Sequence, residues 1–261
     1  FWLRKRYRSG IEQTFSLCVD SIKQTSCIVS CFPVKFQKLS YYDSFWKKIM
    51  TRITEKLLQF NPDGIFTAAD LASLFPDSSN ARYSLMKRAL AQEEIIRICR
   101  GLYALAPQFR REPVNPYRIA QLIYGPSYIS MESALSFHGM IPEAVYATTC
   151  TCLNKSRNYD TSLGRFSYIR IPQRVFFTGV QRMVTASGDV FFMASPLKAL
   201  AEFVYARKKN WTGLKPLIES LRIEEDAFSV LTAEDFEVLS GQYGNSRVGA
   251  FLSGIQKELA L

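Results

Sequence analysis

Hydrophobic residues recur at helical spacing in three successive segments of the chain, TRITEKLLQF, TAADLASL and a third that begins near residue 77. NPDG follows the first segment and Phe75-Pro76 follows the second, and both sequences favour chain breaks. Capping oxygens precede the later segments, at Thr67 with Asp70 and at residues 77–79. The pattern therefore predicts three helices, the third extending to about Gln92. The predicted apolar side of the third helix consists of Tyr83, Leu85, Met86, Ala89 and Leu90.

Two β-rich runs follow the third helix. IIRIC and LYALA flank Arg100-Gly101, which predicts a two-stranded hairpin with Arg97 and Arg100 near its tip. Three helices followed by a hairpin is the order of a winged helix-turn-helix, which places its third helix in the major groove of DNA. We therefore expect a winged helix-turn-helix DNA-binding domain over residues 50–111.

The chain changes character after the proline-containing linker RREPVNP. A helix is predicted from Tyr117 to Tyr124, and Ser130 and Ser133 are predicted to cap a second helix, MESALSFHG. Strands are predicted at AVYATTCTCL, GRFSYIRIP, RVFFTGVQRMV and DVFFMA, and further helices at SPLKALAEFVYARKK, GLKPLIESL, TAEDFEVLSGQY and SRVGAFLSGIQKEL. The expected fold class is therefore α+β, with the N-terminal winged helix-turn-helix followed by a mixed α+β effector domain over residues 112–261.

The first 49 residues form a separate region of the sequence. They are basic and aromatic, and Glu12, Asp20 and Lys23 interrupt any apolar stretch that a signal peptide would need. The first methionine, Met50, lies directly before the first regular helical pattern. We therefore interpret residues 1–49 as a non-native or disordered N-terminal extension, with a native basic arm as the alternative. The three cysteines of this region supply too few ligands for a structural zinc site.

The chain carries 33 lysines and arginines against 23 acidic residues, and its net charge of +10 favours an anionic partner such as nucleic acid, a membrane surface or an acidic protein. On the third helix, residues at positions i, i+4, i+7 and i+8 project together, and these are Asn80, Ser84, Lys87 and Arg88. Amide, hydroxyl and cationic groups of this kind contact phosphates and base edges. The predicted DNA-binding residues of the helix and the hairpin are Ser79, Asn80, Arg82, Ser84, Lys87, Arg88, Arg97 and Arg100. A charged outer face on a protein-docking module is the alternative interpretation of the same pattern.

A second basic stretch lies in the predicted sheet, since residues 155–209 contain ten basic and three acidic side chains. Its arginines are a candidate surface for an anionic partner, and they are Arg157, Arg165, Arg170, Arg174 and Arg182. Because alternate positions of a strand share a face, Arg165 and Arg174 are candidates to lie near each other at strand ends.

The sequence contains no recognisable catalytic motif, and no catalytic residue, metal site or cofactor is predicted. The single histidine, His138, precedes Gly139 at the end of a helix, where a capping or buried structural role is expected. Cys150 and Cys152 share one face of a strand, which favours packing over metal binding. The acidic residues within 224–237 are expected to be solvated, although such clusters also bind divalent metals and leave a metal-dependent nuclease as an alternative.

No apolar stretch of the sequence is long enough to span a bilayer without charges. The best candidate, VFFMASPLKALAEFVYA, is interrupted by Lys198 and Glu202. The six cysteines are unevenly spaced and do not resemble a disulfide framework, which favours a reducing compartment. We therefore expect a cytoplasmic protein without a membrane partner.

Four segments together resemble the AbiEi-type antitoxin family of type IV, or abortive-infection, toxin–antitoxin systems. The segments are RGLYAL, PSYISMESALSFHGMIPEAV, ATTC and FFMASPLKALAEFVY, and the resemblance covers roughly Met50 to the C-terminus. It implies a bacterial or archaeal protein whose winged helix binds inverted repeats in double-stranded DNA at its own promoter and represses its operon. It also implies a C-terminal domain that counteracts a nucleotidyltransferase-like toxin, without enzymatic activity or a cofactor.

For individual residues, the resemblance implies DNA contacts by the polar stripe of the third helix and by Arg97 and Arg100. It implies a mainly structural role for a segment that contains Ser133, Ala134, Leu135 and His138. Glu93-Glu94 stands where relatives usually have a glycine between the recognition helix and the hairpin, which leaves the angle of the hairpin open. The resulting hypothesis is a DNA-binding repressor and antitoxin. The alternatives are a protein-interaction module with a non-DNA-binding winged helix and a metal-dependent nuclease.

Overall fold

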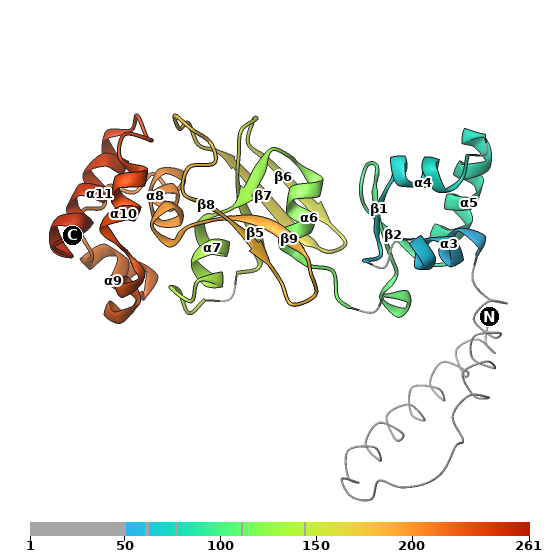
Figure 1. Cartoon of the computed structure of the whole chain (residues 1–261), viewed down its shortest axis with the longest axis horizontal. Helices are drawn as coiled ribbons and strands as arrows, with labels where there is room; N and C mark the ends of the chain where they lie inside the picture. The colour runs from blue at the N-terminus through green and yellow to red at the C-terminus, as the bar shows by residue number, and fades with distance from the viewer. Residues whose placement is uncertain (1–50, 61–62, 77, 111, 144) are drawn as a thin grey trace, which may run out of the picture. The chain divides into compact units, whose positions relative to one another are not determined.

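The computed structural model describes residues 51–60, 63–76, 78–110, 112–143 and 145–261, and the interpretation of residues 1–49 lies outside this part of the chain. The described residues form a mixed α+β fold with two sheets (Figure 1). A three-stranded antiparallel sheet lies near the N-terminus, and a six-stranded mixed sheet follows. The α+β class predicted from the sequence is therefore confirmed.

The three predicted helices pack together on one side of the first sheet (Figure 1). These helices are α3 (Arg52–Phe60), α4 (Ala68–Leu74) and α5 (Ser79–Ala91). The predicted hairpin is formed by β2 (Ile95–Cys99) and β3 (Leu102–Leu105). A further strand, β1 (Ile65–Thr67), pairs with β3 and gives the order β1-β3-β2. The sequence did not predict β1 because three residues are too few to show a two-residue alternation.

Side-chain caps fix where α4 and α5 begin. Thr67 and Asp70 form the predicted capping box, with the Asp70 backbone N–H donating to Thr67 Oγ1 and the Thr67 backbone N–H donating to Asp70. Ser78 Oγ accepts a hydrogen bond from the backbone of Ala81 at the start of α5. These two caps account for the short break between the helices.

The apolar side of α5 is narrower than predicted. Met86 and Ala89 are buried, but Tyr83 is 69% exposed, so its placement on the apolar side was wrong. At 100° per residue, Tyr83 lies about 120° from Ala89 around the helix axis and falls outside the strip that contacts the sheet. Packing over so narrow a strip leaves most of the α5 surface open to solvent.

Glu93 and Glu94 connect α5 to the hairpin without a glycine. Glu93 takes a left-handed backbone conformation with φ of 56°, which a glycine would adopt more easily. Glu94 is buried, and its carboxylate accepts hydrogen bonds from the Thr51 backbone at 3.0 and 3.1 Å, from Thr51 Oγ1 at 2.7 Å and from Thr54 Oγ1 at 2.5 Å. A carboxylate at the N-terminus of α3 also compensates the helix dipole. A buried acid therefore joins the start of the hairpin to the start of α3.

The second sheet contains six strands in the order β6-β7-β5-β4-β9-β8. Their bounds are β4 (Ser127–Ile129), β5 (Ala147–Cys152), β6 (Arg157–Thr161), β7 (Gly164–Arg170), β8 (Val180–Val184) and β9 (Val190–Ala194). Strands β5 and β7 pair in parallel, whereas β6–β7, β4–β5 and β8–β9 are antiparallel. Four of these strands were predicted, and β8 begins later than its hydrophobic run suggested. The two missed strands are β4, which has three residues, and β6, whose sequence RNYDT is mostly polar.

Six helices accompany this sheet in the part of the chain from 112 onward that the structure describes. They are α6 (Pro116–Ile123), α7 (Met131–Phe137), α8 (Pro196–Ala206), α9 (Lys215–Leu221), α10 (Ala233–Leu239) and α11 (Ser246–Glu258). Two short 3-10 helices, Pro107–Phe109 and Glu225–Val230, lie in the connections. Helices α10 and α11 pack against α8 (Figure 1). No helix in the described ranges combines the length and apolar composition that crossing a bilayer requires.

Ser130 and Ser133 do not cap α7 through their side chains, contrary to the prediction. Ser130 Oγ instead donates to the Glu202 carboxylate at 2.5 Å. Ser133 Oγ accepts from the Thr149 backbone at 2.8 Å, and Thr149 Oγ1 accepts from the Ser133 backbone at 3.0 Å. Both hydroxyls are buried and join α7 to α8 and β5, because distant polar groups offer them partners that the local cap pattern does not reveal.

The core of the larger sheet contains an ion pair between Lys198 and Glu202, one turn apart on α8. Both side chains are completely buried, and Lys198 Nζ lies 3.1 Å from Glu202 Oε1. Glu202 Oε1 also accepts from the hydroxyls of Tyr128 at 2.5 Å and Tyr243 at 3.2 Å. Glu202 Oε2 accepts from Thr151 Oγ1 at 2.6 Å as well as from Ser130. Both oxygens of this buried carboxylate therefore have hydrogen-bond partners.

The buried Lys198 ammonium also has hydrogen-bond partners among the residues around Glu202. Its Nζ donates to Gln173 Oε1 at 2.6 Å and to the Tyr243 hydroxyl at 3.3 Å. Gln173 Nε2 donates to the Tyr128 hydroxyl at 2.7 Å and so closes the network. Burial and the nearby Glu202 charge raise the pKa of Tyr128 and of Tyr243 well above the ordinary tyrosine value. The two charges that interrupt the apolar run of the sequence thus lie in the middle of the core.

Removing one partner of this ion pair should destabilise the folded protein. Glu202→Gln leaves the Lys198 ammonium buried without a counter-charge. Lys198→Met likewise leaves the Glu202 carboxylate buried without a counter-charge. We expect each single variant to lower the free energy of unfolding by about 3–5 kcal/mol, and the double variant to lower it by less than the sum. Urea unfolding measures all three values.

The exposed pair Lys215 and Glu219 is the matched control, since the same two changes there should have little effect on the free energy of unfolding. Additive losses at Lys198 and Glu202 would contradict the coupling.

Candidate nucleic-acid interface

The predicted polar stripe of α5 lies on the exposed side of the helix. Asn80, Ser84, Lys87 and Arg88 are all exposed. At 100° per residue they span about 100° of the helix surface, on the side opposite Met86 and Ala89. The structure therefore brings these four side chains together on one open surface.

The two cations of the stripe are available to a ligand. Among the residues that the structure describes, Lys87 and Arg88 form no ion pair. Arg88 Nε makes a long hydrogen bond of 3.4 Å to the Ser84 carbonyl, which directs the guanidinium back along the helix. An amide and a hydroxyl beside two uncompensated positive charges suit contacts to a phosphate backbone and to base edges.

Ser79 and Arg82 differ from the stripe. Ser79 is exposed at the first position of α5. Arg82 is only half-exposed, on the same side of the helix as Ala89, and its Nη1 donates to the Phe75 carbonyl at 3.1 Å. Phe75 is the C-cap of α4, so Arg82 fixes α5 against the end of the preceding helix.

Tyr83 belongs to the exposed surface beside the stripe, although the sequence pattern assigned it to the core. It lies about 60° from Asn80 around the helix. An exposed aromatic ring next to polar and cationic groups adds apolar contact area to a binding surface. The sequence pattern assigned Tyr83 to the buried face because large aromatic side chains are usually buried.

The hairpin places its two arginines at different points. Arg100 lies in the turn beside Gly101, whose φ of 84° the turn requires. Arg97 lies in the middle of β2, opposite Tyr103 on β3, and its Nε makes a 3.4 Å hydrogen bond to the Cys99 carbonyl. Both side chains are exposed. Only Arg100 is therefore at the tip that the sequence predicted for both.

The five arginines of the second basic stretch do not form one surface. Arg157 lies on β6 and Arg182 on β8, and these strands are the two edges of the sheet. Arg165 is the second residue of β7 and is paired with Asp160 at 2.7 Å. Arg170 ends β7, and Arg174 lies in the segment that follows. Five residue steps of β7, about 16 Å at about 3.3 Å per residue, separate Arg165 from Arg170, after which the chain leaves the strand before Arg174.

The residues considered for catalysis have structural partners. His138 ends α7, and its Nε2 donates to the Ala194 carbonyl of β9 at 2.9 Å. Cys150 and Cys152 are buried within the core of the larger sheet. Asp235 forms a capping box with Thr232 at the start of α10. Among the described residues, no group of three or more histidine, cysteine or acidic side chains is arranged to hold a metal ion.

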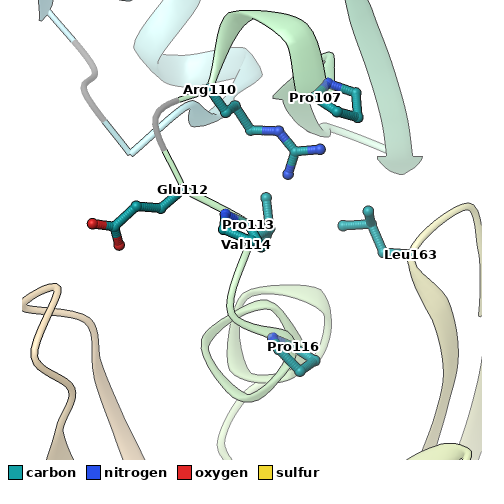
Figure 2. Close-up of a pocket in the computed structure, with 7 residues that line it drawn as sticks. All are labelled: Pro107, Arg110, Glu112, Pro113, Val114, Pro116 and Leu163. Atoms are coloured by element: carbon teal, nitrogen blue, oxygen red, sulfur yellow. The ribbon is translucent and has the colours of Figure 1, made fainter. Parts of the chain in front are cut away.

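A surface hollow beside the linker offers no catalytic arrangement. Its lining consists of Pro107, Arg110, Glu112, Pro113, Val114, Pro116 and Leu163 (Figure 2). In Figure 2 the Arg110 side chain extends over Pro113 and Val114, while the Glu112 carboxylate points away from it. Partial burial lowers the pKa of the Arg110 guanidinium. Proline and aliphatic carbon make up the rest of the lining, and the one carboxylate and the one cation point apart, so the hollow holds no paired nucleophile and base.

Comparison with known proteins adds no assignment. A scan against protein-family models found none that matches this chain, and a search of curated proteins found no match. The function must therefore be inferred from the residues of α5 and the hairpin.

His138 should act as a structural group whose protonation opposes folding. Burial lowers its pKa below the ordinary value of 6.5, so the unfolded chain binds a proton more readily than the folded chain. Its contribution to stability is therefore full above pH 6.5 and decreases as the pH falls toward the folded pKa. Urea unfolding at pH 7.5 and 5.5 should show a smaller pH dependence in His138→Gln than in the unaltered chain. This comparison isolates one group because the sequence has a single histidine. An equal pH dependence in both proteins would contradict it.

Proposed function

We propose that this chain is a DNA-binding transcriptional repressor of the winged helix-turn-helix type, acting as the antitoxin of a type IV toxin–antitoxin system. The observation that carries the DNA-binding part is the exposed stripe of Asn80, Ser84, Lys87 and Arg88 on α5. Three helices, a hairpin and a third short strand also match the order expected of a winged helix-turn-helix.

In this proposal α5 is the recognition helix and the β2–β3 hairpin is the wing. The thirteen residues of α5 give a length of about 20 Å, and an α-helix fits the width of the major groove. Asn80 and Ser84 then face base edges, and Lys87 and Arg88 contact phosphates or guanine. Arg97 and Arg100 hold the backbone beside the groove.

The shape of α5 supports this assignment over a purely structural helix. Only Met86 and Ala89 are buried on it, so its outer surface is not needed for packing. Ser78, Arg82 and Glu94 fix both ends of the helix through hydrogen bonds, and a recognition surface requires a rigid position.

The antitoxin part of the proposal rests on the sequence resemblance. In it, the protein binds inverted repeats at its own promoter and represses its operon, and residues 112–261 counteract a nucleotidyltransferase-like toxin. The protein works in the cytoplasm without a cofactor or enzymatic activity.

Changing Lys87 and Arg88 to alanine should weaken DNA binding. We expect a loss of at least about tenfold in affinity for the DNA upstream of the protein's own reading frame, because each cation contributes on the order of 1–3 kcal/mol. The slope of log affinity against log salt should decrease by about one for each phosphate that the variant no longer neutralises. Fluorescence anisotropy over a range of salt concentrations measures both.

Lys215→Ala with Lys257→Ala removes the same net charge from α9 and α11 and should leave both values nearly unchanged. Equal binding by the unaltered chain and the α5 variant would overturn the interface.

Antitoxin activity should be separable from DNA binding. When a neighbouring nucleotidyltransferase-like toxin and the Lys87→Ala, Arg88→Ala variant are expressed from unrelated promoters, the full-length variant should restore growth as well as the unaltered chain. Failure of the unaltered chain to restore growth would overturn the antitoxin part alone. Restored growth by an unaltered chain that itself shows no affinity for the upstream DNA would favour the alternative, a protein-interaction module whose three-helix segment is only a scaffold.

A further inference from the structure

A basic hollow lies at one end of the β6–β7 pair. It is lined by the end of α6, the loop after β5 and the ends of β6 and β7, through Tyr124, Leu153, Asn154, Lys155, Arg157 and Arg170. Three of these six residues are cations and none is acidic. A local cluster of one sign of charge concentrates counter-ions at that point.

The strand register explains why the cations gather. Arg157 on β6 lies directly opposite Tyr168 on β7, and Arg170 follows Tyr168 by two residues. Because alternate residues of a strand share a face, Arg157 and Arg170 project from the same side of the sheet as diagonal neighbours. Lys155 precedes Arg157 by two residues and lines the same hollow.

The three charges are not compensated within the described part of the chain. Lys155, Arg157 and Arg170 are exposed, and none of them forms an ion pair there. Arg165 provides the contrast, since it lies on the opposite face of β7 and is paired with Asp160 at 2.7 Å. An anion in the hollow would therefore relieve repulsion among three neighbouring cations.

Hydrogen bonds hold the loop that carries Lys155. The Tyr124 hydroxyl donates to the Lys155 carbonyl at 3.0 Å, and the Arg170 backbone N–H donates to Ser156 Oγ at 2.9 Å. The Leu153 backbone donates to the Pro126 carbonyl at 3.2 Å. The Arg157 guanidinium lies over the Tyr124 ring, 5.6 Å from its centroid. These contacts fix the backbone of the loop, and a fixed backbone reduces the entropy lost on binding.

We propose that this hollow binds the phosphoryl group of a small phosphorylated molecule. Two guanidinium groups and an ammonium carry three positive charges, enough to neutralise a phosphate dianion, and guanidinium groups bind phosphate oxygens through paired hydrogen bonds. A nucleic-acid backbone would favour a row of spaced cations, whereas here Arg165 is neutralised and Arg182 lies on the opposite edge strand. The site is independent of the DNA-binding proposal for α5.

The test uses the full chain and inorganic phosphate as the probe. Backbone amide NMR shifts are followed while phosphate replaces chloride at constant ionic strength. We expect saturable shifts at Asn154, Lys155, Ser156 and Arg170, and a loss of about tenfold or more in phosphate affinity in Arg157→Ala with Arg170→Ala. Arg182→Ala is the matched control and should bind phosphate normally. Lys155→Ala, an exposed change in a loop, should weaken binding and guards against a misfolded double variant.

The outcomes distinguish a specific phosphate site from general ion screening and from a DNA-backbone contact. Shifts that do not saturate, or that are equally strong around Arg182, would show general ion screening and overturn the proposal. Absence of phosphate binding, combined with loss of operator affinity in the Arg157→Ala, Arg170→Ala variant, would overturn it in favour of a second DNA-backbone contact. Phosphate binding that persists in the Lys87→Ala, Arg88→Ala variant is expected whether or not α5 binds DNA.

Discussion

The buried pair of Lys198 and Glu202 is the constraint on which the larger domain depends. Two charges on α8 cannot enter an apolar core unless polar groups surround them. Those groups come from segments far apart in the sequence, because Tyr128 lies on β4, Thr151 on β5, Gln173 after β7 and Tyr243 after α10. An arrangement that displaces any of these segments leaves a buried donor or acceptor without its partner. The network therefore selects one packing of α8 against the central strands.

The same constraint explains how a three-residue strand can be central. β4 pairs over few residues, yet both Tyr128 on β4 and Ser130 directly after it donate to Glu202. The position of β4 is thus fixed by side chains as well as by the sheet ladder. With α8 and β4 fixed, the sheet edges β6 and β8 are left to present polar and basic residues to solvent. The scaffold of this domain and its candidate anion site are therefore separate groups of residues.

The sequence predicted an element correctly where a local pattern of residues was enough to identify it. Helices α4 and α5 showed both a 3.6-residue period and a cap, α3 showed the period alone, and the structure confirms all three. β1 and β4 were missed because they are too short for a pattern, and β6 because its sequence RNYDT is mostly polar. Ser130 was misread as a cap because its true partner, Glu202, is 72 residues away. The clustering of Arg157 with Arg170 depends on strand register, which periodicity does not specify.

Recognition by α5 and stability of the three-helix segment make different demands on the same helix. Its buried strip, Met86 and Ala89, is narrow, and Leu85 and Leu90 pack beside it against the core. Hydrogen bonds also position the helix near its ends, through the Ser78 cap, the bond from Arg82 to the Phe75 carbonyl and Glu94, which bonds the start of α3. Because none of these bonds involves Asn80 or Lys87, side chains of the outer face can change while α5 keeps its position. A surface with that freedom is suited to the evolution of sequence specificity, since new base contacts would not have to preserve a core.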